Sequence, residues 1–266
     1  MKAKDFITYK NWFFTYTDFF LTADQHFNYH IILKREHCKR VAEEIVLLGR
    51  SLKLPSEELM LSEVIGLYHD LGRFEQYKTY KTFSDEKSVD HADLGEKIVR
   101  DKGIFDDLNK EERGIIHSCI RCHNKLSLSD DLNERQRFFI HMLRDADKLD
   151  IWKVLIKHYL SENKDKNTVL LDLPDSPTMS EKVIHAVNNK RLAKKEHIKS
   201  VNDFIVLNMS WVFDLNFPYT FQQVSKRNYI NTLISVLPDT DKVREISEIV
   251  QNYLEKNIGI KQNVTD

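Results

Sequence analysis

The sequence predicts an all-α protein, a helical bundle followed by a helical C-terminal extension. Three observations support this fold class. Apolar residues recur at three- and four-residue intervals along most of the chain, as they do on the buried face of a helix. Only 7 of the 266 residues are glycine, against about 19 in a chain of average composition. Lys, Glu and Leu, which favour helices, are abundant, and so few glycines leave little material for the turns of a sheet protein.

The chain is long enough for one large domain or two small ones, and its 41% hydrophobic content is ample for a core. We expect residues 1–160 to form this core together with an N-terminal helical segment. Residues 161–180 are polar and contain Pro174 and Pro177, so we expect a linker or loop there. Residues 181–266 are expected to form the helical extension, packed on the core.

Charge and cysteine content limit the partners that can be expected. The 40 basic and 41 acidic residues give a net charge of −1, which offers no overall attraction to a nucleic acid polymer or an anionic membrane. The N-terminal apolar patches, 12–14 and 19–21, are too interrupted for a signal peptide or a spanning helix. The three cysteines make no disulfide framework, and the spacing of Cys119 and Cys122 favours helix packing over a zinc site. We expect a cytoplasmic protein whose oligomeric state stays open.

The first part of the chain places candidate ligands on two inward helix faces. An apolar stripe follows His37 at helical spacing, so His37 points inward; the stripe consists of Val41, Ile45, Leu48 and Leu52. Pro55-Ser56 is a start signal for the next helix, whose apolar face leads to His69-Asp70. Gly72 is expected to end this helix. Taken alone, the His-Asp pair is more simply a helix end with a core histidine and a solvated aspartate, and the metal-site interpretation depends on the rest of the chain.

The loop and helix that follow place a further histidine inside the bundle. Residues 75–90 are polar and aromatic without a sustained period, so we expect a loop that could cover a pocket. Asp90 is an N-cap signal for a helix whose inner face begins with His91. His91 is therefore expected to face inward.

A capping box predicts the start of the next helix. Asn109 and Glu112 have the spacing of such a box. On this helix His123 shares a face with apolar residues, whereas His117 lies about 120° away around the axis; the apolar residues are Ile116, Cys119 and Ile120. His123 is therefore expected to be the buried histidine.

The helix expected from about residue 133 to 160 carries an aspartate on its apolar face. Asp147 lies in the middle of the apolar stripe, whereas Asp145 is about 160° away; the stripe consists of Ile140, Leu143, Ile151, Val154 and His158. An unpaired carboxylate in such a position is costly, so Asp147 requires a cation. A satisfied buried hydrogen bond is the alternative.

The segment after residue 180 is expected to be helical again. Apolar residues repeat at helical spacing before Pro218, before Pro238 and once more near the C-terminus. The basic residues in 190–199 are most simply a solvated helix face rather than a phosphate-binding patch; they are Lys190, Arg191, Lys194, Lys195 and Lys199.

The order of the inward residues, H, HD, H, H, D, resembles the HD-domain superfamily of metal-dependent phosphohydrolases over residues 36–156. The resemblance implies an HD-type helical bundle with one metal ion held by the first histidine, the His-Asp pair and the last aspartate; here these are His37, His69, Asp70 and Asp147. It further implies a second ion, completed by His91 and His123 and bridged by Asp70. Members with these two additional histidines are similar to cyclic-nucleotide and cyclic-di-nucleotide phosphodiesterases.

In addition to Asp70, which is itself a catalytic candidate, three residues are candidates for catalysis or substrate binding. Arg73 is expected to meet the charge of a phosphate, as a basic residue there does in much of the family; a surface salt bridge to Glu75 or Asp85 is the alternative. His117 is an outer-shell acid or is simply exposed. Asn124 is a candidate substrate contact. It stands where the cyclic-di-nucleotide branch has another histidine, and the Gly-Tyr-Pro signature of that branch is missing, which argues against that substrate.

The expected cofactor is a divalent metal, one or two ions. Mixed imidazole and carboxylate ligands favour Mn, Fe, Zn, Ni or Co over Mg. Two ions about 3.5–4 Å apart would generate a hydroxide in line for attack at phosphorus. We therefore expect hydrolysis of a small phosphate monoester or diester, most simply a nucleotide. The alternative is a non-catalytic regulatory module that binds a nucleotide or a protein partner.

Overall fold

The computed structural model describes residues 1–160, 173–174, 176 and 178–258, and the regular elements within them are all helices. The all-α fold expected from the sequence is therefore confirmed. The chain divides into two compact units, Met1–Asp150 and Ile151–Asp266. Most of the linker predicted at 161–180 lies outside the described residues, so the linker and the packing of the extension on the core stay predictions.

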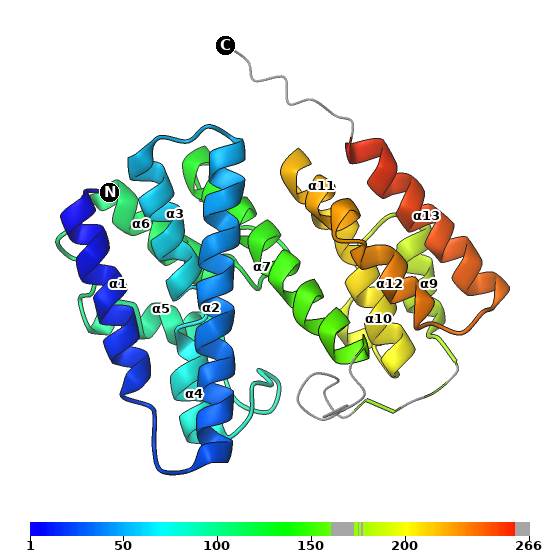
Figure 1. The fold of residues 1–266 in the computed structure, drawn as a ribbon, viewed down its shortest axis with the longest axis horizontal. Helices are drawn as coiled ribbons and strands as arrows, with labels where there is room; N and C mark the ends of the chain where they lie inside the picture. The colour runs from blue at the N-terminus through cyan, green and yellow to red at the C-terminus, as the bar shows by residue number, and fades with distance from the viewer. Residues whose placement is uncertain (161–172, 175, 177, 259–266) are drawn as a thin grey trace. The chain divides into compact units, whose positions relative to one another are not determined.

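The first unit is a bundle in which the third helix is central. α3 lies between α1 and α2 and packs against both (Figure 1). α5 packs against α4 and α6. The helices of this unit are α1 (Ala3–Asp18), α2 (Gln25–Ser51), α3 (Ser56–Tyr68), α4 (Gly72–Tyr80), α5 (His91–Asp101), α6 (Lys110–Cys122) and the first part of α7 (Glu134–Leu160).

Side-chain caps set the starts of α2, α5 and α6, and the sequence predicts the caps of α5 and α6. The Asp90 carboxylate accepts hydrogen bonds from the first amides of α5, and the Asn109 side chain accepts one from the Glu112 N–H in α6. Asp24 caps α2 in the same way. Pro55 precedes the first residue of α3. These caps matter for the site because α5 begins with His91.

An aromatic cluster fixes α1 against the C-terminal end of α3. The Tyr68 ring contacts those of Phe13 and Phe105, with centroid distances of 5.7 and 4.9 Å, and Phe13 also meets Phe74 at 6.1 Å. The Tyr68 hydroxyl donates a hydrogen bond to the carbonyl oxygen of Tyr9 at 2.8 Å. The residue directly before His69 is thereby held in the core.

The expected boundary after the His-Asp pair is wrong. α3 ends at Tyr68, and Gly72 begins α4 rather than ending α3, so residues 75–80 are helical and the loop is confined to 81–90. Gly72 is required for packing. A Cβ at this position would lie 2.1 Å from the carbonyl oxygen of His91 and 2.6 Å from the amide of Gly95. The missing side chain lets α4 approach α5 closely.

The second unit is built around Trp152. Its indole N–H donates to the carbonyl oxygen of Asn208 at 3.1 Å, and its ring contacts Trp211 and Tyr229 at 5.8 and 6.2 Å. The described elements of this unit are the end of α7, α9 (Glu181–Asn188), η1 (Lys195–His197), α10 (Val201–Ser210), η2 (Trp211–Asp214), α11 (Pro218–Lys226), α12 (Tyr229–Ser235) and α13 (Asp241–Ile258).

One expectation for the second unit is wrong. The basic segment 190–199 is not a helix face: α9 ends at Asn188, Lys190 adopts a left-handed φ of 52°, and the single turn η1 follows. The helical segment before Pro218 ends at Asp214, as expected, and Pro218 itself occupies the first turn of α11, where a missing N–H costs nothing.

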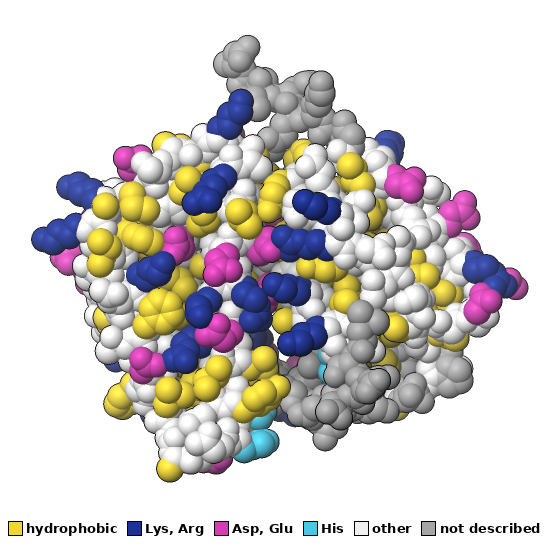
Figure 2. Space-filling view, in the orientation of Figure 1, with side chains coloured by type: hydrophobic (Ala, Val, Ile, Leu, Met, Phe, Trp, Pro, Cys, Tyr) yellow, Lys and Arg dark blue, Asp and Glu magenta, His cyan; other side chains and the backbone are white. Residues whose placement is uncertain are grey.

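The surface and the cysteines agree with the composition. Basic and acidic side chains are interspersed on the face drawn in Figure 2, in keeping with a net charge of −1. Cys38, Cys119 and Cys122 are buried free thiols. No described helix combines the length and the apolar content that crossing a bilayer requires.

Two glycines test the close packing of this bundle. A Cβ on Gly66 in α3 would lie 2.5 Å from the Cα of Ala42 in α2, whereas one on Gly114 in α6 would meet only Gln136 Nε2 at 3.7 Å. We expect Gly66→Ala to lower the free energy of unfolding by about 1–3 kcal/mol through overpacking. Gly114→Ala should leave it unchanged or raise it by up to about 1 kcal/mol, because alanine favours helices. Urea unfolding of both variants measures this, and equal effects would contradict the close α2–α3 contact.

Candidate metal centre

Four histidines and one aspartate converge in the core of the first unit. α2 supplies His37, the turn after α3 supplies His69 and Asp70, and the start of α5 supplies His91. His123 directly follows the last residue of α6. All five side chains are more than nine-tenths buried. The predicted inward orientation of the four histidines is therefore what the structure shows.

The two carboxylate oxygens of Asp70 face two different pairs of histidines. Oδ2 lies 3.5 Å from His37 Nε2 and 3.7 Å from His69 Nε2. Oδ1 lies 3.2 Å from His91 Nε2 and 3.7 Å from His123 Nε2. The donor atoms of each pair and of Asp70 lie within 4.8 Å of one another. Asp70 can thus bridge two ion positions, the first beside His37 and His69 and the second beside His91 and His123.

Each of the four histidine rings makes a hydrogen bond through Nδ1, the nitrogen that does not face Asp70. His37 Nδ1 donates to Asp150 and His91 Nδ1 donates to Asp85, both at 2.7 Å. The Nδ1 atoms of His69 and His123 donate to the backbone carbonyl three residues earlier, both at 2.8 Å. Since Nδ1 carries the proton in each neutral ring, every Nε2 presents a lone pair to Asp70.

The contact between His91 and His123 tests whether this set fits a metal. Their Nε2 atoms lie only 3.0 Å apart. In the neutral rings both atoms are acceptors, so two lone pairs face each other with no proton between them. A cation that both nitrogens coordinate relieves this repulsion. Imidazole nitrogens with a shared carboxylate are a donor set for a divalent transition metal, and the residues present therefore fit such an ion.

Asp147 from α7 lies beside the first pair of histidines. Its Oδ1 lies 3.2 Å from His37 Nε2 and 3.7 Å from His69 Nε2, and this atom is buried without a hydrogen bond among the described residues. Burial raises the pKa of Asp147, but the two histidines outweigh it and hold the pKa well below its ordinary value.

The burial expected around Asp147 is partly wrong. The Asp147 side chain is 19% exposed. Asp145, which the helical phase places on the opposite face, is fully buried, and Asp150 is 1% exposed. Residues on more than one face of α7 are buried in this region. The angle between a residue and the apolar stripe therefore did not predict its exposure.

Burial and neighbouring charged groups shift the pKa values of the candidate ligands. Burial lowers the pKa of His69 to about 4, so this ring is neutral at neutral pH. Burial raises the pKa of Asp70, but Lys34 and His69 outweigh it and bring the pKa well below its ordinary value. Lys34 Nζ lies 2.9 Å from Asp70 Oδ2. The bridging carboxylate is therefore ionised and ready to bind cations.

Sequence reasoning missed three residues that contact the ligands. Asp150 accepts a hydrogen bond from His37 Nδ1. It also accepts hydrogen bonds from Arg40 Nε and Nη2, at 2.6 and 3.0 Å. Lys34 lies one helical turn before His37, so helical spacing alone could have found it. Asp85 was expected only as a surface partner of Arg73. It lies in a loop without periodicity, and no sequence signal marks its contact with His91.

The three other candidates take different positions. Arg73 is only 14% exposed, and its Nη1 donates to Asp85 at 2.7 Å, so the alternative partner is present but the pair is not a surface one. Arg73 Nε lies 3.5 Å from Asp70 Oδ1. His117 Nδ1 is 3.1 Å from Glu96 Oε1, away from the ligands. Asn124 donates to Asp90 at the start of α5.

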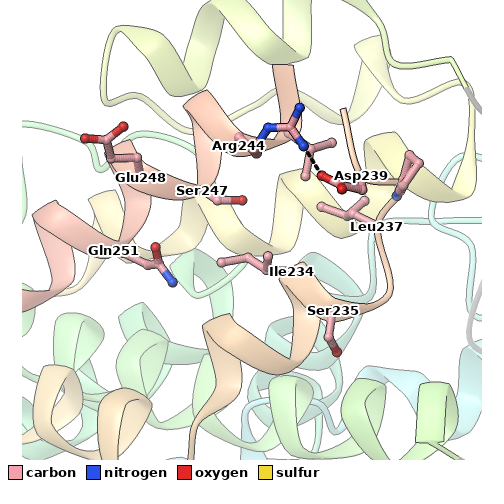
Figure 3. A pocket seen from close by; sticks show the side chains of 10 residues that line it. Ile234, Ser235, Leu237, Asp239, Arg244, Ser247, Glu248 and Gln251 are labelled. Atoms are coloured by element: carbon pink, nitrogen blue, oxygen red, sulfur yellow. Dashed lines mark hydrogen bonds and ion pairs between the residues drawn. The ribbon is translucent and has the colours of Figure 1, made fainter. Parts of the chain in front are cut away.

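Two further features of the chain resemble binding sites but lack the free donor atoms of the histidine cluster. Asp85, Asp90 and His91 form a third group of acceptor atoms, yet the Asp90 oxygens already bind helix amides, Asn124 and Lys125. A pocket of about 410 Å³ lies in the second unit between α12 and α13 (Figure 3). It is lined by apolar side chains, the Arg244–Asp239 ion pair and the polar residues Ser235, Ser247, Glu248 and Gln251, with no histidine among them.

The comparisons with known proteins agree with this geometry. The HD domain family pattern matches residues 35–200, more than half of the chain, and this match includes every proposed metal ligand. Searches of curated proteins and of solved structures gave no match.

The bridging geometry predicts how ligand substitutions change the number of bound ions. Asp70→Asn should remove both ions, because both positions lose their shared charge. His91→Ala should remove one and leave about one per chain. Metal analysis of the purified variants, with circular dichroism to confirm folding, measures this. An Asp70→Asn protein that keeps one ion would contradict a bridging carboxylate, and unchanged stoichiometry in His91→Ala would indicate a mononuclear site.

Proposed function

The chain belongs to the HD domain family, and from its metal centre we propose that it is a phosphohydrolase that cleaves a small phosphorylated substrate, most simply a nucleotide. HD domain proteins are usually metal-dependent hydrolases. The observation that carries the proposal is the position of Asp70, whose two oxygens serve two separate pairs of histidines. A regulatory module that only binds a ligand would have no need of two complete ion positions.

The residues fit the first ion through His37, His69, Asp70 and Asp147 and the second through Asp70, His91 and His123. Nitrogen and oxygen ligands together favour Mn, Fe, Zn, Ni or Co over Mg. Such ions, when bound, lower the pKa of water and neutralise charge on a phosphoryl group.

Arg73 is the side chain best placed to bind the substrate's phosphate. Its Nη1 makes all of its hydrogen bonds among the described residues, to Gln76, Phe83 and Asp85. Its Nε is buried without a hydrogen-bond partner there and lies 3.5 Å from Asp70 Oδ1. A buried donor of this kind is costly unless a ligand uses it. Arg73 can therefore donate from its Nε edge to a phosphate beside the bridging carboxylate.

Lys34 is a second cation at the same carboxylate. Its Nζ lies 2.9 Å from Asp70 Oδ2, on the side of His37 and His69, whereas Arg73 approaches Oδ1. The two basic side chains thus flank Asp70 on opposite oxygens. Together they provide positive charge for an anionic substrate in a chain whose net charge is close to zero.

A hydrolysis panel tests the proposal. Protein loaded with Mn, Ni or Mg should release phosphate from one or more nucleotide monoesters or diesters, and Asp70→Asn should abolish this activity. Arg73→Ala should lower kcat/KM by about 100-fold or more, since it removes a donor to the phosphoryl group. Protein that binds two ions but turns over none of these substrates would instead be a non-catalytic module.

Ion binding should also weaken at low pH. A proton and an ion compete for the same Nε2 lone pair. Burial and Lys34 lower the pKa of His37, but Asp147 and Asp150 outweigh them, so the pKa lies above its ordinary value of 6.5. As the pH falls, His37 therefore takes up a proton before His69 does. Ion affinity should fall as the pH drops through the pKa of His37. Mn²⁺ titrations at about pH 8 and about pH 5.5 measure this, and equal affinities would contradict it.

A further inference from the structure

Two of the site histidines are oriented by carboxylates that are held by arginines. Arg40, Asp150 and His37 form one such series, and Arg73, Asp85 and His91 form the other. The two series differ in origin. Asp150 lies in the helix α7, whereas Asp85 lies in the loop 81–90 between α4 and α5.

We propose that Asp85 is a positioning residue that couples the second ion position to the phosphate-binding arginine. Both oxygens of this carboxylate accept from His91 Nδ1 and orient its ring, and Oδ1 also accepts from Arg73 Nη1 and anchors it. The part that concerns Arg73 rests on the proposed function, whereas the part that concerns His91 stands on the ion site alone.

The place of His91 in the fold explains why a loop carboxylate is needed. His69 and His123 follow the ends of helices, so each ring reaches the carbonyl three residues earlier in its own helix. His91 is the first residue of α5 and has no preceding helical turn to supply such a carbonyl. Its Nδ1 instead lies 2.7 and 3.0 Å from the two oxygens of Asp85. Without Asp85, nothing else among the described contacts of His91 fixes this ring nitrogen.

Asp85 also determines which edge of Arg73 is available to a ligand. Arg73 Nη1 donates to Gln76 Oε1 at 2.9 Å, to the Phe83 carbonyl at 2.6 Å and to Asp85 Oδ1 at 2.7 Å. Asp85 is the charged acceptor of the three. These bonds occupy Nη1 and turn the Nε edge towards Asp70.

The carboxyl group of Asp85 is suited to this double role. Burial raises its pKa, but His91, Arg73 and Gln76 outweigh burial and hold the pKa well below its ordinary range. Asp85 is therefore ionised over the working pH range. Gln76 fixes it further, since its Nε2 donates to Asp85 Oδ1 at 2.9 Å and to the Val89 carbonyl across the loop.

Asp90 provides a matched control in the same loop. It is also a carboxylate near His91, but its oxygens accept hydrogen bonds from the α5 amides, Asn124 and Lys125. Asparagine is as good an N-cap as aspartate, so Asp90→Asn should fold. Asp85→Asn and Asp90→Asn each remove one negative charge from the same neighbourhood, but only the first replaces the charged acceptor of His91 Nδ1 with a neutral amide.

The first experiment is a Mn²⁺ titration of the parent, Asp85→Asn and Asp90→Asn proteins by calorimetry, with metal analysis of the products. The Kd of the more weakly bound ion should rise about 10- to 100-fold in Asp85→Asn, because the outer-shell partner of a ligand histidine loses its negative charge. Asp90→Asn should match the parent. Parent-like binding in Asp85→Asn, or equal weakening in both variants, would overturn the proposal.

A double variant identifies the ion that is affected. Asp85→Asn combined with His91→Ala should bind as many ions as His91→Ala alone, about one, because both changes act on the same position. Fewer ions in the double variant would mean that Asp85 supports the first position, and the assignment to His91 would be wrong.

Inorganic phosphate tests the coupling to Arg73. With Mn²⁺ high enough to fill both positions, phosphate should bind about tenfold more weakly to Asp85→Asn than to Asp90→Asn, since the charged anchor of the arginine is gone. Equal phosphate affinities would overturn the coupling. If the parent binds two ions but neither binds phosphate nor hydrolyses any ester, the proposed function fails, while the Mn²⁺ titrations still decide the role of Asp85 at His91.

Discussion

The structure of the first unit depends on the burial of four imidazoles around one carboxylate. Buried rings must have both nitrogens satisfied, because an unpaired polar atom in the core costs free energy. Each Nδ1 finds an acceptor in the protein, two in backbone carbonyls and two in carboxylates. The four Nε2 atoms are then directed at Asp70, where only cations satisfy them together. The chemistry of the site is a consequence of how the rings are buried.

The helices are arranged so that their ends meet at this point. His69 and Asp70 follow α3, His123 follows α6, and His91 begins α5, so three helix termini converge on the same carboxylate. Glycines allow the approach. Gly66 brings α3 against α2, which carries His37, and Gly72 brings α4 against the start of α5. Side chains at either position would separate the ligands.

Helical spacing predicted which candidate ligands on helices point inward, because burial repeats with the period of the helix. His37 and His123 were placed in the core in this way, and the ordered set was strengthened by its resemblance to a known family. The period could not show that Gly72 starts a helix, since its role is a close contact with α5. Nor could it find Asp85, whose partners are fixed by the fold of a loop. Residues that orient ligands through tertiary contacts leave no pattern in the chain.

The distribution of charge distinguishes the two ion positions. Three ion pairs lie around the site: Lys34 with Asp70, Arg40 with Asp150, and Arg73 with Asp85. Asp147 is faced by His37 and His69, and its buried Oδ1 makes no hydrogen bond within the described chain. Because Asp147 adds a second carboxylate to the first position, that position carries more negative charge than the second, which has only its share of Asp70. An ion at the first position would therefore be held mainly by charge, whereas one at the second would depend on imidazole nitrogens and on the carboxylate that orients His91.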